Sequence, residues 1–112
     1  MDSMLKEAVA SLFCHIIKTG GGSMDEERAL FCRFMQQNFR GTTCAELMEL
    51  YEATCKKLYN VDTKISIIAN ALTQKTYEKM SIFKQAKHLV LKDNPRQKDY
   101  EILEKLKRAL AL

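Results

Sequence analysis

Apolar residues recur along this chain at steps of three and four positions, the spacing that places them on one face of an α-helix. The first stripe predicts a helix over residues 3–18, and it consists of Leu5, Val9, Leu12, Phe13 and Ile16. The glycine run at residues 20–22 favours a helix end, because glycine readily takes the positive φ of a helix C-cap. Ser23 and Glu26 then have the S-x-x-E spacing of a capping box, which satisfies free amide groups at a helix start. A second helix is expected to begin there.

Four more helices are predicted by the same kinds of signal. Gly41 is expected to end the second helix, and the capping box Thr43–Glu46 to open the third. Asn60, followed by Asp62, is expected to cap the fourth, and a fifth is expected over residues 76–91. Asn94-Pro95 is typical of an N-cap with proline at the first helical position, before the last helix. The residues predicted to point inward on these helices are Leu30, Phe31, Phe34, Leu47, Leu50, Tyr51, Leu58, Ile65, Ile68, Ala71, Leu72, Met80, Phe83, Val90, Ile102, Leu103, Leu106 and Leu110.

The fold class follows from this pattern. No strand-like alternation competes with the helical period, and the single proline lies at a helix start. With 112 residues, the chain suits one domain over 1–112 and is short for two. The sequence therefore predicts an all-α, compact bundle of about five to seven helices.

A weak internal repeat is visible within the bundle. Three apolar positions of the second helix recur in the last helix at a constant offset of 72, and two of the first helix recur in the fifth at 71. The pairs are Leu30 with Ile102, Phe31 with Leu103, Phe34 with Leu106, Val9 with Met80, and Leu12 with Phe83. One helix-loop-helix unit is thus expected to occur twice, although any two amphipathic helix pairs can match this well by chance.

Composition and charge narrow the function classes. Apolar residues make up 46% and charged residues 29%, so neither a disordered chain nor membrane insertion is expected. The net charge of +4 is concentrated at the C-terminal end, where residues 74–112 hold ten Lys and Arg against five Asp and Glu. Lysines of this spacing are typical of solvated helix faces, and no nucleic-acid motif accompanies them, so nucleic-acid binding stays a lesser alternative.

Four cysteines, Cys14, Cys32, Cys44 and Cys55, lack the C-x-x-C spacing of zinc or thioredoxin-like motifs. They are expected to be unpaired small core residues in a reducing compartment. The first residues lack a basic region and a small-residue cleavage signal, so no secretory signal is predicted. The expected localisation is the cytoplasm.

Two loop–helix junctions resemble the tellurite-resistance TerB-like family. The first is Lys18-Thr-Gly-Gly-Gly-Ser-Met-Asp-Glu-Glu-Arg-Ala-Leu-Phe31, and the second is Leu91-Lys-Asp-Asn-Pro-Arg-Gln-Lys-Asp-Tyr-Glu-Ile-Leu103. The family pattern is an apolar helix, an Asp-Gly loop, an acidic helix start and an Arg-Ala-Leu-like run, and it typically occurs twice. The resemblance implies a single TerB-like helical domain, with a role in stress or in metal (tellurite) resistance.

The resemblance also implies candidate metal ligands, which are Asp25, Glu26, Glu27, Asp93, Asp99 and Glu101. The chain departs from the Asp-Gly pattern in both loops. In the first loop a glycine, Gly20 or Gly21, replaces the aspartate, and in the second loop Asp93 is kept but Asn94-Pro95 replaces the glycine. Acids in a first helical turn are also favoured by the helix dipole alone. Consecutive acids point in different directions around a helix, so a site for a divalent metal requires that the two junctions converge.

No catalytic centre is predicted. Cys14 and His15 are a thiol and an imidazole, but neighbours on a helix point about 100° apart and cannot easily hydrogen-bond to each other. No third member of a triad and no phosphate-binding glycine loop accompany them. The leading interpretation is a non-enzymatic module without a cofactor that binds a partner protein or a membrane-associated complex. The alternatives are a metal-responsive domain that uses the acidic junctions, and a nucleic-acid-associated protein that uses the basic C-terminal helices.

Overall fold

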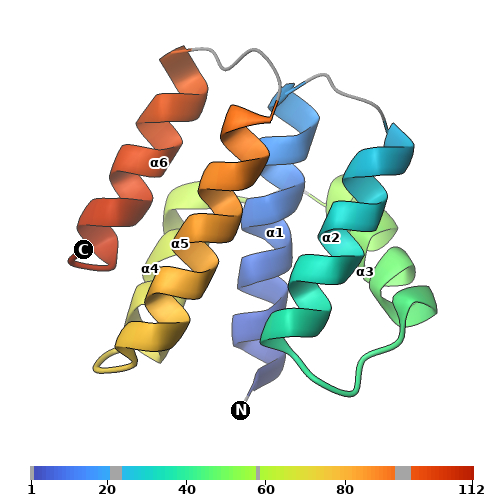
Figure 1. Cartoon of the computed structure of the whole chain (residues 1–112), viewed down its shortest axis with the longest axis horizontal. Coiled ribbons are helices and arrows are strands. Elements are labelled where there is room, and N and C mark those ends of the chain that lie inside the picture. The colour runs from blue at the N-terminus through green and yellow to red at the C-terminus, as the bar shows by residue number, and fades with distance from the viewer. Residues whose placement is uncertain (1, 21–23, 58, 93–96) are drawn as a thin grey trace.

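The computed structural model describes residues 2–20, 24–57, 59–92 and 97–112, and these form a bundle of six helices (Figure 1). No strand occurs among the described residues, and the radius of gyration is 12.8 Å. The prediction of an all-α compact bundle of five to seven helices is therefore confirmed. The helices are α1 (Asp2–Gly20), α2 (Met24–Asn38), α3 (Cys44–Lys56), α4 (Val61–Ala71), α5 (Thr76–Leu91) and α6 (Gln97–Ala109).

Three helix-end signals in the sequence are confirmed at described residues. The Thr43 hydroxyl accepts a hydrogen bond from the Glu46 amide at 3.2 Å and so begins α3. The Asn60 side chain accepts from the amides of Asp62 and Thr63 at the start of α4. Gly41 has a φ of +86°, the left-handed conformation that glycine adopts without strain, in the turn after α2. The expected bounds of α5 coincide with the observed ones.

Several expected features fall outside the described residues. These are the glycines at 21–22 with the Ser23 cap, the inward position of Leu58, and the Asp93 and Asn94-Pro95 segment before α6.

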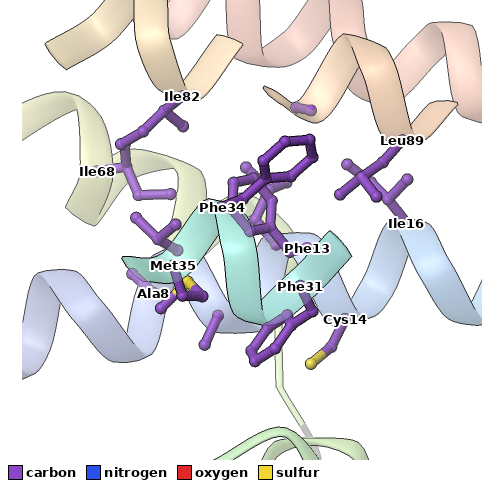
Figure 2. Close-up of a cluster of buried hydrophobic side chains, with 14 of the residues drawn as sticks. Ala8, Phe13, Cys14, Ile16, Phe31, Phe34, Met35, Ile68, Ile82 and Leu89 are labelled. Carbon is purple, nitrogen blue, oxygen red and sulfur yellow. The ribbon is translucent and has the colours of Figure 1, made fainter. Parts of the chain in front are cut away.

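The core is arranged around α1, which contacts all five other helices (Figure 1). Ala8 and Ala10 of α1 have no exposed surface. Because their side chains are small, the neighbouring helices can come close to α1. Figure 2 shows the rings of Phe13, Phe31 and Phe34 gathered beside α1. The rings of Phe13 and Phe34 pack edge to face with their centroids 6.2 Å apart, a favoured aromatic arrangement. The largest fully buried side chains are Phe13, Phe31, Leu12, Ile16, Met35, Leu47, Ile68, Leu106, Leu110, Val9 and Cys14.

The inward face of α5 differs from the predicted one. Met80 was expected to point inward and is 43% exposed, so that prediction is wrong, and Phe83 is only partly buried. Ile82, Ala86 and Leu89 form the buried face instead, with the predicted Val90. Apolar residues occur around most of this helix, so the period alone could not select one face. Ala71, at the end of α4, is likewise exposed rather than inward.

The expected repeat pairs α1 and α2 with α5 and α6. The second helices of the units match in burial, because Phe31 and Leu103 are both buried. The first helices do not, because Val9 is fully buried and its counterpart Met80 is exposed. Only α1 is central, which explains why its stripe is wider than that of α5.

A disulfide joins Cys32 of α2 to Cys44, the first residue of α3, with the Cα atoms 5.7 Å apart. The prediction of unpaired cysteines is therefore wrong for this pair, and Cys14 and Cys55 are the free ones. The reversal of the chain between α2 and α3 brings the pair together, and no local spacing rule signals such a contact. Among the described helices, none is long and apolar enough to cross a membrane.

Candidate functional site

A groove lies where the start of α1, the end of α2 and the start of α5 meet, at the lower end in Figure 1. We call it the α2–α5 groove. Its volume is about 700 Å³, which is within the usual range of ligand pockets. Its apolar wall consists of Leu5, Phe39, Leu72 and Ile82. Its polar and aromatic lining consists of Gln36, Gln37, Asn38, Arg40, Tyr77, Glu78 and Ser81.

A chain of side-chain amides fixes the side of the groove between α2 and α5. Asn38 Nδ2 donates to Gln85 Oε1 at 2.7 Å, and Gln85 Nε2 donates to Gln37 Oε1 at 2.9 Å. Ser81 Oγ donates to Asn38 Oδ1 at 3.3 Å. Gln85 is buried, so these bonds satisfy polar atoms that would otherwise be costly to remove from water. The network holds α2 and α5 at a fixed separation and leaves the groove between them open.

Two large apolar side chains project beside this network. Tyr77 is 82% exposed and Met80 is 43% exposed, and both line a second hollow that adjoins the groove through Gln37 and Ser81. Tyrosine, methionine and arginine are enriched in protein–protein interfaces, and Arg40 supplies the third of these types at the rim. The surface thus combines apolar anchors with fixed hydrogen-bonding groups.

The charge around the groove is mainly positive. Arg40 lines the groove, Lys84 lines the adjoining hollow, and Glu78 is the acidic residue among the linings of the two. Lys6, on α1, is held close to the turn after α2 by a 3.1 Å hydrogen bond to the Thr42 hydroxyl. A negatively charged group would meet favourable electrostatics on this surface.

The predicted metal ligands that the structure describes lie at the opposite end of the bundle. The starts of α2 and α6 are on opposite sides of α1 in Figure 1. Asp25 and Glu101 are exposed, and Glu26 forms an ion pair with Lys92 at 3.0 Å. Asp93 lies outside the described residues.

The two buried acids of this set have different surroundings. Glu27 is 6% exposed, and its charge adds to the burial that mainly raises the pKa of Tyr51 on α3. Asp99 is 3% exposed, and its charge opposes the burial that mainly lowers the pKa of His15 on α1. Within the described ranges, no three His, Cys, Asp or Glu side chains form a group that could hold a metal ion. A site that includes Asp93 stays a prediction.

A polar cluster lies in the C-terminal half of α1. His15 Nδ1 is 3.3 Å from the Tyr59 hydroxyl, and the two rings meet at a centroid distance of 5.9 Å. Burial lowers the pKa of His15, and Lys18 lowers it further, against the opposing charge of Asp99. Burial raises the pKa of Cys14 on the same helix, and Cys55 raises it further.

Comparison with protein-family models found no match for this chain, and comparisons with curated proteins and with solved structures found none either. The resemblance to the TerB-like family therefore depends on the two junction motifs, and it stays a prediction.

The groove was not predicted from the sequence, although two signals for it exist. Gln85 lies among apolar neighbours on the inward face of α5, and a buried amide requires hydrogen-bonding partners. Tyr77 and Met80 are three positions apart and lie off the buried stripe, so they form an apolar pair on the outer face. Neither signal identifies α2 as the other wall.

Proposed function

We propose that this chain is a non-enzymatic helical binding module that holds a segment of a partner protein in the α2–α5 groove. The observation that carries the proposal is the open groove of about 700 Å³ with Tyr77 almost fully exposed at its edge. A single exposed apolar residue is ordinary, but here an aromatic ring and a methionine adjoin a fixed polar network and a cavity.

The groove's chemistry favours an acidic segment that carries an apolar side chain. The wall of Leu5, Phe39, Leu72 and Ile82 offers a place for the apolar side chain. The positive charges of Arg40 and Lys84 favour carboxylates of the bound segment, whereas Glu78 repels carboxylates that lie next to it. Buried or half-buried aromatic and arginine anchors usually supply most of the energy of such contacts. Tyr77, Met80 and Arg40 are therefore the residues expected to carry the affinity.

The resemblance to the TerB-like family supports a cellular setting for this binding. It implies a role in stress or metal (tellurite) resistance, and a partner protein or membrane-associated complex. A cytoplasmic location is part of the same proposal, and the Cys32–Cys44 disulfide counts against it, because disulfides are more typical of oxidising compartments.

The test starts from a library of random peptides displayed on phage, selected on the immobilised full chain. We expect the selected peptides to share acidic residues around one large apolar residue. Their binding is measured by fluorescence anisotropy, and amide shifts are mapped by NMR. The double variant Tyr77→Ala/Met80→Ala is expected to weaken binding at least about tenfold, as for interface anchors.

The matched control is Tyr100→Ala, which removes a tyrosine that is 49% exposed on α6, away from the groove. It is expected to leave the affinity unchanged. Equal affinity of the double variant and the wild-type chain, or amide shifts confined to α6, would contradict the proposed groove.

A nucleic-acid partner is an outcome of the test that would favour the alternative of a nucleic-acid-associated protein. Lys84, Lys87 and Lys92 line a shallow hollow on α5 with His88 and Leu91, and such a surface suits phosphates. The measurement is the binding of a labelled oligonucleotide. Binding that falls steeply with salt and is lost in Lys84→Glu/Lys87→Glu would favour nucleic-acid binding over the groove proposal.

A further inference from the structure

A row of exposed side chains runs along the length of α5, off its buried face. Its members are Tyr77, Met80, Lys84, Lys87 and Leu91, and all of them are exposed. We call this row the α5 stripe. Its members follow at steps of three, four, three and four positions, the spacing with which one helix lies along another. At a rise of about 1.5 Å per residue, the stripe is roughly 21 Å long.

The helix α2 flanks α5 beyond the α2–α5 groove. The two helices run in opposite directions (Figure 1), and the side-chain amide network joins them near the middle of α5. About one turn further along α5, the rings of Phe34 and His88 meet edge to face with their centroids 5.6 Å apart. After the end of α5, Lys92 forms its 3.0 Å ion pair with Glu26. The C-terminal half of α5 therefore has α2 beside it, as the N-terminal half has at the groove.

The surface beside the stripe is hollowed along its length. The α2–α5 groove adjoins the hollow that Tyr77, Met80 and Lys84 line. Lys84 also lines the next hollow, together with Lys87 and Leu91. The groove is therefore the first part of a longer trough along α5. A bound segment that filled the groove alone would leave the rest of this trough uncovered.

The stripe is apolar at both ends and positive in its middle. Lys84 and Lys87 lie between the apolar pair at the start of the stripe and Leu91 at its end. Arg33 of α2 is exposed and adds a positive charge, with its guanidinium carbon 5.4 Å from the ring centroid of Phe34. Lysine stems cover apolar surface while their ammonium groups reach out to opposite charges. The complementary segment is therefore acidic in its middle and apolar at both ends.

We infer that the occupant of this trough is an amphipathic helix of a partner protein, with apolar residues at the two ends of one face and acidic residues between them. The inference rests on the proposed function, because it names the shape of the segment held in the groove and extends its contact to Leu91. An extended segment commonly takes its affinity from main-chain hydrogen bonds to a sheet edge, and the described residues form no sheet. A helix in a groove presents its anchors at steps of three and four, which are the steps of the α5 stripe.

The test uses a synthetic peptide of the length of α5, 16 residues. A side-chain lactam holds it helical, and one face carries leucines at both ends with glutamates between them. One control peptide has the same composition with these residues spread around the helix, and another has two prolines at its centre and no lactam. Fluorescence anisotropy with the full chain is expected to show at least about tenfold tighter binding of the patterned helix than of either control. Its amide shifts in NMR should extend from Tyr77 to Leu91.

The variant Leu91→Ala separates this inference from the proposed function, because Leu91 lies beyond the α2–α5 groove. It is expected to weaken binding of the patterned helix about fivefold or more, as loss of an apolar anchor does. Leu112→Ala is the matched control, since Leu112 is 39% exposed at the end of the chain and Leu91 is 44% exposed. It should leave the affinity unchanged.

The outcomes that contradict the inference differ from those that contradict the groove. Unchanged affinity in Leu91→Ala, with weaker binding in Tyr77→Ala/Met80→Ala, would overturn the helix and leave the groove proposal standing. Equally tight binding of the proline-containing peptide would do the same. Unchanged affinity in both variants would overturn both proposals. Binding of duplex DNA or of a second copy of the chain at the α5 stripe, in place of the patterned helix, would also overturn the inference.

Discussion

His15 is a half-buried imidazole whose protonation is opposed by its surroundings. It lies beside the Tyr59 hydroxyl, with Lys18 and Asp99 as the charges that act on it. Loss of water on burial lowers its pKa below the ordinary value of about 6.5, and Lys18 adds to this while Asp99 opposes it. The neutral ring is therefore the form that fits the folded state.

This shift sets the direction of a pH dependence. In the unfolded chain, His15 takes up its proton at a higher pH than in the folded chain, so acid favours unfolding. Its contribution to stability is complete above about pH 6.5 and is lost as the pH falls through the lower folded-state pKa. Urea unfolding at pH 7.5 and pH 5.0 should show a smaller loss of stability for His15→Gln than for the wild-type chain.

The control for this measurement is His88→Gln, because His88 is exposed on α5. It is expected to behave as the wild-type chain does. If His15→Gln loses as much stability between the two pH values as the wild-type chain, His15 does not contribute to the pH dependence.

Helices could be predicted from the sequence because their signals are local. The Thr43 and Asn60 caps act on amides two or three residues away, and Gly41 takes its positive φ within one turn. By contrast, contacts between residues that are distant in the sequence decide which face of α5 is buried. Such contacts also bring Cys32 to Cys44. The same holds for the α2–α5 groove, which forms only when residues 43 and 47 positions apart meet.

The Cys32–Cys44 disulfide is expected to stabilise the docking of α3. It closes a loop with a sequence separation of 12 residues, and a loop of similar length contributes about 3 kcal/mol in the chain-entropy account. Reduction should therefore lower the free energy of unfolding by about 2–4 kcal/mol. The measurement is urea unfolding with and without a phosphine reductant, followed by circular dichroism.

The variant Cys32→Ser/Cys44→Ser is the control, since its stability should be the same with and without reductant. If the reductant leaves the free energy of unfolding of the wild-type chain unchanged, the Cys32–Cys44 disulfide does not contribute to its stability in solution.

At the scale of the whole molecule, the bundle depends on one helix. Because α1 contacts the five other helices, a cavity in α1 weakens several packing contacts at once. Leu12→Ala, at a fully buried position, should cost about 2–5 kcal/mol, whereas Leu12→Met should cost under about 1.5 kcal/mol. Denaturant unfolding followed by circular dichroism and by tyrosine fluorescence should give coincident transitions for both variants.

Met4→Ala is the matched control on the same helix, because Met4 is exposed. It should change stability by less than about 0.5 kcal/mol. Separate transitions for the two probes in Leu12→Ala would show that part of the bundle folds without α1.

The central place of α1 also bears on how the protein is made. A ribosome releases α1 before any of the helices that cover it, and several of its partners, including α4, α5 and α6, are encoded well downstream. Synthesis proceeds at about 5–20 residues per second, so the apolar face of α1 is synthesised several seconds before the last helix that covers it. During that interval the nascent chain presents Val9, Leu12, Phe13 and Ile16 together, the kind of surface that chaperones hold. The order of the helices along the chain thus delays the complete burial of α1 until α6 has been synthesised.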